Sequence, residues 1–200
     1  MSAEFVEEFY RSHAELGAYL LNAKELTYAT DFNTTFRRSL VLAIASFFEH
    51  EVTTVLREIP LRHAPRSAFI AAAFERQVIT RKYHTYFDWD NLKPGQFFIL
   101  FGDGYKELAR VRMRQDPLVG AAVASFLELG QTRNKLVHQN FVSFAVDKTP
   151  EELIVQFRAA LPFVAFLRET LLSRASTRFR PGRGWNPARQ RLSVRRIKRG

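Results

Sequence analysis

Three side chains that could act together on a phosphodiester lie within six residues of the chain. Arg133, Asn134 and His138 form the pattern R-N-x-x-x-H in the segment "RNKLVH". RNA can be cut without a metal ion when its own 2′-hydroxyl attacks the adjacent phosphate. Histidine can exchange the proton of this reaction near neutral pH, and arginine can hold the phosphate through two parallel hydrogen bonds. An amide can position the histidine or bind a phosphate oxygen, and DNA, which lacks the 2′-hydroxyl, should not be cut.

A single apolar helix is expected to carry these residues. Asp116 followed by Pro117 is typical of a helix start, because aspartate caps the first turn and proline fits its first position. The helix should reach about Phe144, although Gly130 could break it. Its apolar stripe comprises Val119, Ala122, Val123, Phe126, Leu129, Leu136, Val137 and Phe141.

The direction of Arg133 on this helix distinguishes an ordinary surface from a site. At about 100° per residue, Arg133 falls near the middle of the apolar stripe, whereas Asn134 and His138 lie on one side, near its edge. A guanidinium among apolar side chains is costly unless something compensates its charge. A break at Gly130 could reset the helical phase, or Glu49 on another helix could form an ion pair. Alternatively, the stripe could face a cleft or a second copy of the protein, where an anionic substrate would be held.

The rest of the chain predicts an all-α bundle of four to five helices with an aromatic-rich insertion. No stretch alternates with period two for long enough to require a sheet. We expect the insertion, residues 82–105, to be ordered, partly helical and packed on the domain. The other expected helices are residues 3–22, a central apolar helix from Asp31 or Asn33 to about Glu58 that Pro60 closes, residues 65–81, and residues 150–173 with a kink near Pro162.

The net charge of +10 comes from the end of the chain. Residues 170–200 contain ten Arg or Lys and no acid, so basic and acidic residues balance over 1–169. We predict a helical domain over residues 1–173 and a basic, disordered tail over 174–200. The tail could hold RNA by counterion release, bind an acidic partner such as an antitoxin or a ribosome surface, or only increase solubility. The candidate RNA-binding residues are Lys135, Arg178, Arg180, Arg183, Arg195 and Arg196.

The composition excludes several kinds of site. Without cysteine there are no disulfides, thiolate zinc sites or cysteine nucleophiles, which fits a reducing compartment. No histidine or carboxylate cluster has metal-binding spacing, and no glycine-rich loop follows a strand, so we expect neither a metal nor a cofactor. The N-terminus has no basic segment typical of a secretion signal, and the longest apolar run, residues 39–48, is about half of what a bilayer requires. We expect a cytoplasmic protein with no membrane partner.

The motif and its surroundings together resemble the HEPN superfamily. The signature of that superfamily is an arginine, a polar residue that is often asparagine, and a histidine a few residues further on, in a late helix of an all-α bundle. The central helix "SLVLAIASFFEHEV" resembles the second signature helix of prokaryotic stand-alone HEPN proteins, including the RiboL-PSP-like group. The segments "YHTYFDWD" and "FFILFG" resemble an insertion found in some members. The resemblance covers about residues 1–172.

This resemblance implies a metal-independent endoribonuclease that leaves a 2′,3′-cyclic phosphate, in a toxin–antitoxin or phage-defence setting. Members generally act as homodimers in which both copies of the motif face one cleft. Arg133 would then bind the scissile phosphate, His138 would transfer the proton, and Asn134 would position one of them. Glu49 matches a polar residue that several groups keep on the central helix and would support these residues. Some members have lost the catalytic residues and only bind nucleotide, RNA or a protein partner, which is the alternative function.

Two further histidines have both a functional and an ordinary interpretation. His50, next to Glu49, could line the same cleft, but an exposed position on the helix is the commoner case. His84 lies among Tyr83, Phe87 and Trp89, whose rings could stack on unpaired bases or could plug the bundle, and the plug is the better-supported interpretation. A third kind of function, an inhibitor or adaptor that acts through the tail, also fits the sequence.

Overall fold

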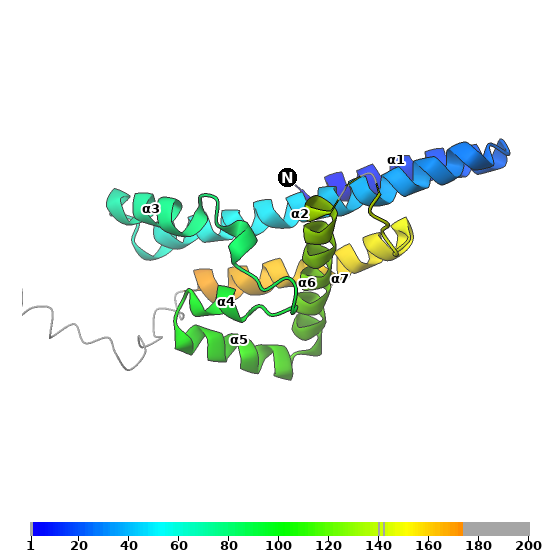
Figure 1. The fold of residues 1–200 in the computed structure, drawn as a ribbon. Coiled ribbons are helices and arrows are strands. Elements are labelled where there is room, and N and C mark those ends of the chain that lie inside the picture. The colour runs from blue at the N-terminus through cyan, green and yellow to red at the C-terminus, as the bar shows by residue number, and fades with distance from the viewer. Residues whose placement is uncertain (1, 140, 142, 174–200) are drawn as a thin grey trace, which may run out of the picture.

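The structure is a computed structural model that describes residues 2–139, 141 and 143–173. The predicted tail, with Arg178, Arg180, Arg183, Arg195 and Arg196, lies outside the described residues. Within them the chain is all-α, with seven α-helices, one π-helical turn, one 3₁₀ turn and no strand (Figure 1). The elements are α1 (Ala3–Asn22), α2 (Leu26–His63), α3 (Ala68–Phe74), η1 (Glu75–Ile79), η2 (Tyr83–Thr85), α4 (Gly95–Ile99), α5 (Asp103–Gln115), α6 (Pro117–His138) and α7 (Pro150–Leu172).

The long helix α2 is the centre of the bundle, and α1, α6 and α7 pack against it. Figure 1 shows α6 crossing α2 and α7 at a steep angle. Aromatic rings fill the crossing: Phe48 of α2 makes edge-on contacts with Phe126 of α6 at 5.4 Å and Phe157 of α7 at 5.7 Å. By length and composition α2 could cross a membrane, but the core helix of a bundle meets the same criteria. Its packing against the other helices explains its apolar middle without a membrane.

Helix α2 is longer at both ends than the sequence predicted. It begins at Leu26, because Lys24 takes a left-handed conformation (φ 60°) and closes a tight connection from α1. Asp31 and Asn33 therefore lie inside the helix and do not cap it. Pro60 lies in the last turn, where the missing N–H removes a single hydrogen bond and the ring is buried.

The residues before the insertion also differ from expectation. The expected helix over residues 65–81 is α3, which changes into the π-helical turn η1 and ends before Arg81, whose φ is 58°. The insertion itself is ordered, partly helical and packed on the bundle, as predicted. Phe87 lies 4.9 Å from Phe126 of α6, and Trp89 is 7% exposed, so the aromatic segment is a plug.

Helix α6 begins as predicted and ends earlier. The carboxylate of Asp116 accepts the N–H of Leu118 at 3.0 Å, and the helix continues through Gly130 without a break. It ends at His138 and not near Phe144, because the following loop packs on α2, where Arg38 donates to the carbonyl of Phe144 at 2.8 Å. Helix α7 starts with a complete capping box between Thr149 and Glu152, and Pro162 lies inside it.

Candidate active site

Arg133 lies on α6 one turn beyond the contact between the insertion and the helix. Gly130 allows that contact, because a Cβ atom there would lie 2.8 Å from Cη2 of Trp89 and nearer still to two other ring atoms. Gln131 fixes the insertion from the same turn by donating to the carbonyls of Trp89 and Asp90, both at 3.1 Å. The insertion therefore has a fixed position beside Arg133.

The guanidinium of Arg133 is not neutralised by Glu49. Among the residues that the structure describes, no carboxylate oxygen lies within 4.0 Å of its nitrogens. Both charges nevertheless act on the same neighbour. Burial and the Glu49 carboxylate raise the pKa of the Tyr83 hydroxyl well above its usual value, and Arg133 acts in the opposite sense. Helix α6 is not broken at Gly130, and Arg133 forms no ion pair with Glu49. Of the three arrangements expected for Arg133, the structure agrees with the third, because the half-buried side chain lines a hollow.

That hollow, which we call the Arg133 hollow, has a volume of about 320 Å³. Helix α2 lines it with Glu49, Thr53 and Arg57, and the rest of the lining comes from η1, η2, the segment between them and Arg133 of α6. The hollow is also lined by Tyr83 and His84, and by residues to which the sequence did not point: Glu75, Ile79, Thr80 and Arg81. Its volume is at the lower end of the range of about 300–1,000 Å³ in which proteins bind small ligands.

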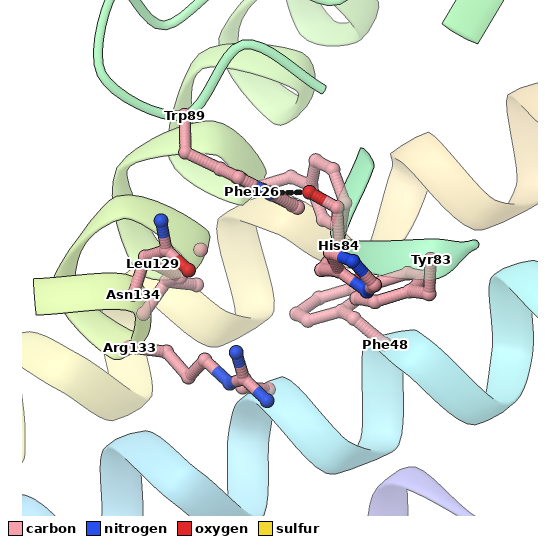
Figure 2. A pocket seen from close by; sticks show the side chains of 10 residues that line it. Phe48, Tyr83, His84, Trp89, Phe126, Leu129, Arg133 and Asn134 are labelled. Carbon is pink, nitrogen blue, oxygen red and sulfur yellow. Dashed lines mark hydrogen bonds between the residues drawn. The ribbon is translucent and has the colours of Figure 1, made fainter. Parts of the chain in front are cut away.

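A smaller crevice of about 20 Å³ adjoins the Arg133 hollow and shares Tyr83, His84 and Arg133 with it. Figure 2 shows Arg133 and Asn134 on one side of this aromatic crevice, with Tyr83 and His84 on the other and Trp89 above. The Arg133 and Asn134 side chains point in different directions, as consecutive residues on a helix do. Arg133 and His84 border both hollows, whereas Asn134 borders only the crevice.

His138 lies outside both hollows. It is the exposed last residue of α6 and lines neither hollow. Five residues along a helix place His138 about 140° around the axis from Arg133. Asn134, four residues before His138, lies on the same side of the helix as His138. The apolar side chains beside it are also uncovered: Val137 is 49% exposed and Phe141 is 40% exposed.

The structure thus brings Arg133 together with Asn134 and Glu49, and leaves His138 separate. Lys135 is exposed, and its Nζ donates to the side chain of Gln131 at 3.3 Å. His50 is exposed and lines neither hollow. No group of His, Asp or Glu suited to a metal ion occurs in the described part of the chain.

Sequence reasoning missed several charged residues that line the Arg133 hollow. Arg57 and Arg81 stand far from the motif in sequence, since Arg57 lines the hollow from α2 and Arg81 lines it from the segment after η1. Arg57 is paired with Glu75 through two hydrogen bonds of 3.1 and 3.2 Å. His84 was singled out only for its aromatic neighbours, although it lies beside the arginine of the motif.

Comparisons with known proteins agree with the all-helical architecture. The family model described as RiboL-PSP-HEPN matches residues 7–173, which include the bundle, the insertion and the whole R-N-x-x-x-H motif. No curated protein and no solved structure matches the chain.

Proposed function

The chain belongs to the RiboL-PSP-HEPN family, and from this premise we propose that it is a metal-independent endoribonuclease. It cuts RNA by attack of the 2′-hydroxyl on the adjacent phosphate and leaves a 2′,3′-cyclic phosphate. The observation that carries the proposal is Arg133, a guanidinium without an ion-pair partner among the described residues, which opens onto a hollow large enough for part of a nucleotide.

Each motif residue has a role that its position supports. Arg133 holds the scissile phosphate and stabilises the charge that increases in the transition state. His138, exposed at the end of α6, exchanges the proton with the 2′-hydroxyl or the leaving oxygen. Asn134 lies on the same side of α6 as His138 and positions the phosphate or the imidazole. Glu49 lines the same hollow as Arg133 and keeps the guanidinium oriented without neutralising it.

We propose that the active form is a homodimer. Within one subunit His138 and Arg133 point about 140° apart, so one copy does not focus both groups on a single phosphate. A second copy seated on the uncovered Val137 and Phe141 would bury apolar surface and bring two copies of His138 toward one cleft.

The setting of this activity follows the sequence and the family. We place the nuclease in the cytoplasm, as a toxin or phage-defence effector whose partners are RNA and a cognate antitoxin. The domain is residues 1–173, and the basic residues 174–200 add affinity for RNA through phosphate contacts. Neither a metal nor a cofactor is needed for the reaction.

The proposal is tested by incubating the full-length protein with labelled RNA in EDTA. Arg133→Ala and His138→Ala should each lower the cleavage rate about 100-fold or more. Matched controls are Arg76→Ala and His50→Ala, since both residues are exposed and line neither hollow, and they should cut like the parent. A substrate with a 2′-deoxy nucleotide at the cut site should stay intact. Equal cleavage by all variants, or cleavage that EDTA stops, would contradict the mechanism.

The alternative function is a non-catalytic HEPN module that binds nucleotide, RNA or a protein partner. The separation of His138 from the Arg133 hollow within one subunit is the observation that favours it. In that case the parent and both motif variants would show no cleavage, and the parent would still bind RNA.

A further inference from the structure

We propose that the Arg133 hollow is an RNA subsite that holds the nucleotide next to the cleaved bond, with the phosphate beyond it bound by Arg81. This inference rests on the proposed function, since it assigns the scissile phosphate to Arg133. It adds a subsite formed by η1 and η2, elements outside the R-N-x-x-x-H motif.

The charges around the hollow favour a phosphate near Arg81. Of the three arginines in its walls, Arg57 is committed to Glu75 by two hydrogen bonds. Within residues 2–139, 141 and 143–173, neither Arg81 nor Arg133 has an ion-pair partner. The hollow thus presents two uncompensated guanidinium groups against one unpaired carboxylate, that of Glu49, and a polyanion would be attracted to it.

The backbone before and at Arg81 is held in an unusual conformation beside this hollow. The chain forms a π-helical turn over Glu75–Ile79, and Arg81 then takes a left-handed φ of 58°. Both features cost free energy relative to a regular helix, and both are enriched at functional sites. Here the helix ends at Ile79, two residues before Arg81, and Arg81 lines the hollow.

The remaining wall groups suit a ribose and a base. Glu49 repels phosphate but can accept hydrogen bonds from ribose hydroxyls or from the amino groups of a base. Tyr83 and the exposed His84 offer ring faces on which a base can stack. A nucleotide would therefore lie with its two phosphates at Arg133 and Arg81 and with its polar edge toward α2.

The test uses the full-length protein and a fluorescent 2′-O-methyl oligoribonucleotide, which binds but cannot be cut. Arg81→Gln should weaken binding about 3- to 10-fold and reduce the slope of log K against log salt by about 0.7, the value for one lost single-strand phosphate contact. Arg81→Lys keeps a positive charge and should restore much of the affinity. Arg76→Gln is the matched control, because Arg76 lies in the π-helical turn that precedes Arg81 but not in the wall of the hollow.

Cleavage kinetics of ordinary RNA separate this inference from the nuclease proposal. Arg81→Gln should raise KM by the same factor and leave kcat unchanged, because Arg81 does not touch the reacting phosphate. If Arg81→Gln binds with the parent's affinity and salt slope, the subsite is overturned even when cleavage is normal. If the protein cuts no RNA but Arg81→Gln still loses binding while Arg76→Gln does not, the subsite stands and the nuclease fails.

Discussion

The contact between Gly130 and Trp89 offers a direct test of how the insertion positions the site. A methyl group at position 130 would lie 2.8 Å from Cη2 of the indole and closer still to Cζ3 and Cε3. The ring cannot simply turn away, because its Nε1 donates to the carbonyl of His84 at 3.0 Å and Gln131 donates to the Trp89 carbonyl at 3.1 Å. Gly130→Ala should therefore push the indole outward and move the segment that carries His84.

Effects of opposite sign determine the size of the change in the free energy of unfolding. Alanine in place of glycine inside a helix stabilises by about 1 kcal/mol. Overpacking against the indole costs about 1–3 kcal/mol, and losing its hydrogen bond to His84 costs about 1 kcal/mol more. We expect a net destabilisation of about 1–3 kcal/mol, or a fall in Tm of roughly 2–12 °C for a domain of this size.

The change is measured by thermal unfolding followed by circular dichroism, with Gly95→Ala as the matched control. A Cβ atom at position 95 would meet only Cε of Lys106, at an ordinary 3.8 Å, so this variant should stay within about 1 kcal/mol of the parent. If Gly130→Ala is as stable as Gly95→Ala, the indole does not rest on α6 as described, and the link between insertion and site is wrong.

Two other predictions concern the fold. Thr149→Ala should cost about 1 kcal/mol in urea unfolding, because Thr149 and Glu152 bond each other's backbone N–H at 3.2 and 2.7 Å, whereas Thr149→Ser keeps the hydroxyl and should cost less. Burial raises the pKa of Tyr86 from 10.0 to about 12. Its neutral form is thus favoured in the folded state, and the resulting stability, complete below pH 10, should be lost as the pH rises toward 12. Tyr86→Phe cannot ionise and should show a shallower loss of unfolding free energy over that interval; an equal slope would exclude this cause.

The sequence by itself determined the helical class, the apolar central helix and the position of the insertion. Helical spacing of apolar side chains and the absence of period-two alternation predict a bundle, and the structure has no strand in its described part. Local capping signals also predicted where two helices begin, since Asp116 and Thr149 cap α6 and α7 as expected. These features are readable because they depend on residues within one or two turns of each other.

Features of the helices that depend on contacts between distant parts of the chain could not be predicted from the sequence. The early end of α6 depends on Arg38 of α2, which binds the loop at the carbonyl of Phe144. The glycine at position 130 reflects a close contact and not a break in the helix, because the ring of Trp89 occupies the space where a side chain would stand. In both cases the deciding partner lies far away in sequence, and a local pattern contains no information about it.

For the candidate site, too, the sequence predicted the residues, and only the tertiary structure showed their surroundings. The sequence named Arg133, Asn134, His138 and Glu49 and left three ways to accommodate the arginine. Tertiary structure alone showed that the guanidinium meets no carboxylate in the described residues but borders a hollow, and that Arg81 lines the same hollow. The physical reason is that a residue's type sets which charge it carries, whereas the packing of other helices decides whether that charge is paired, covered or left open to a ligand.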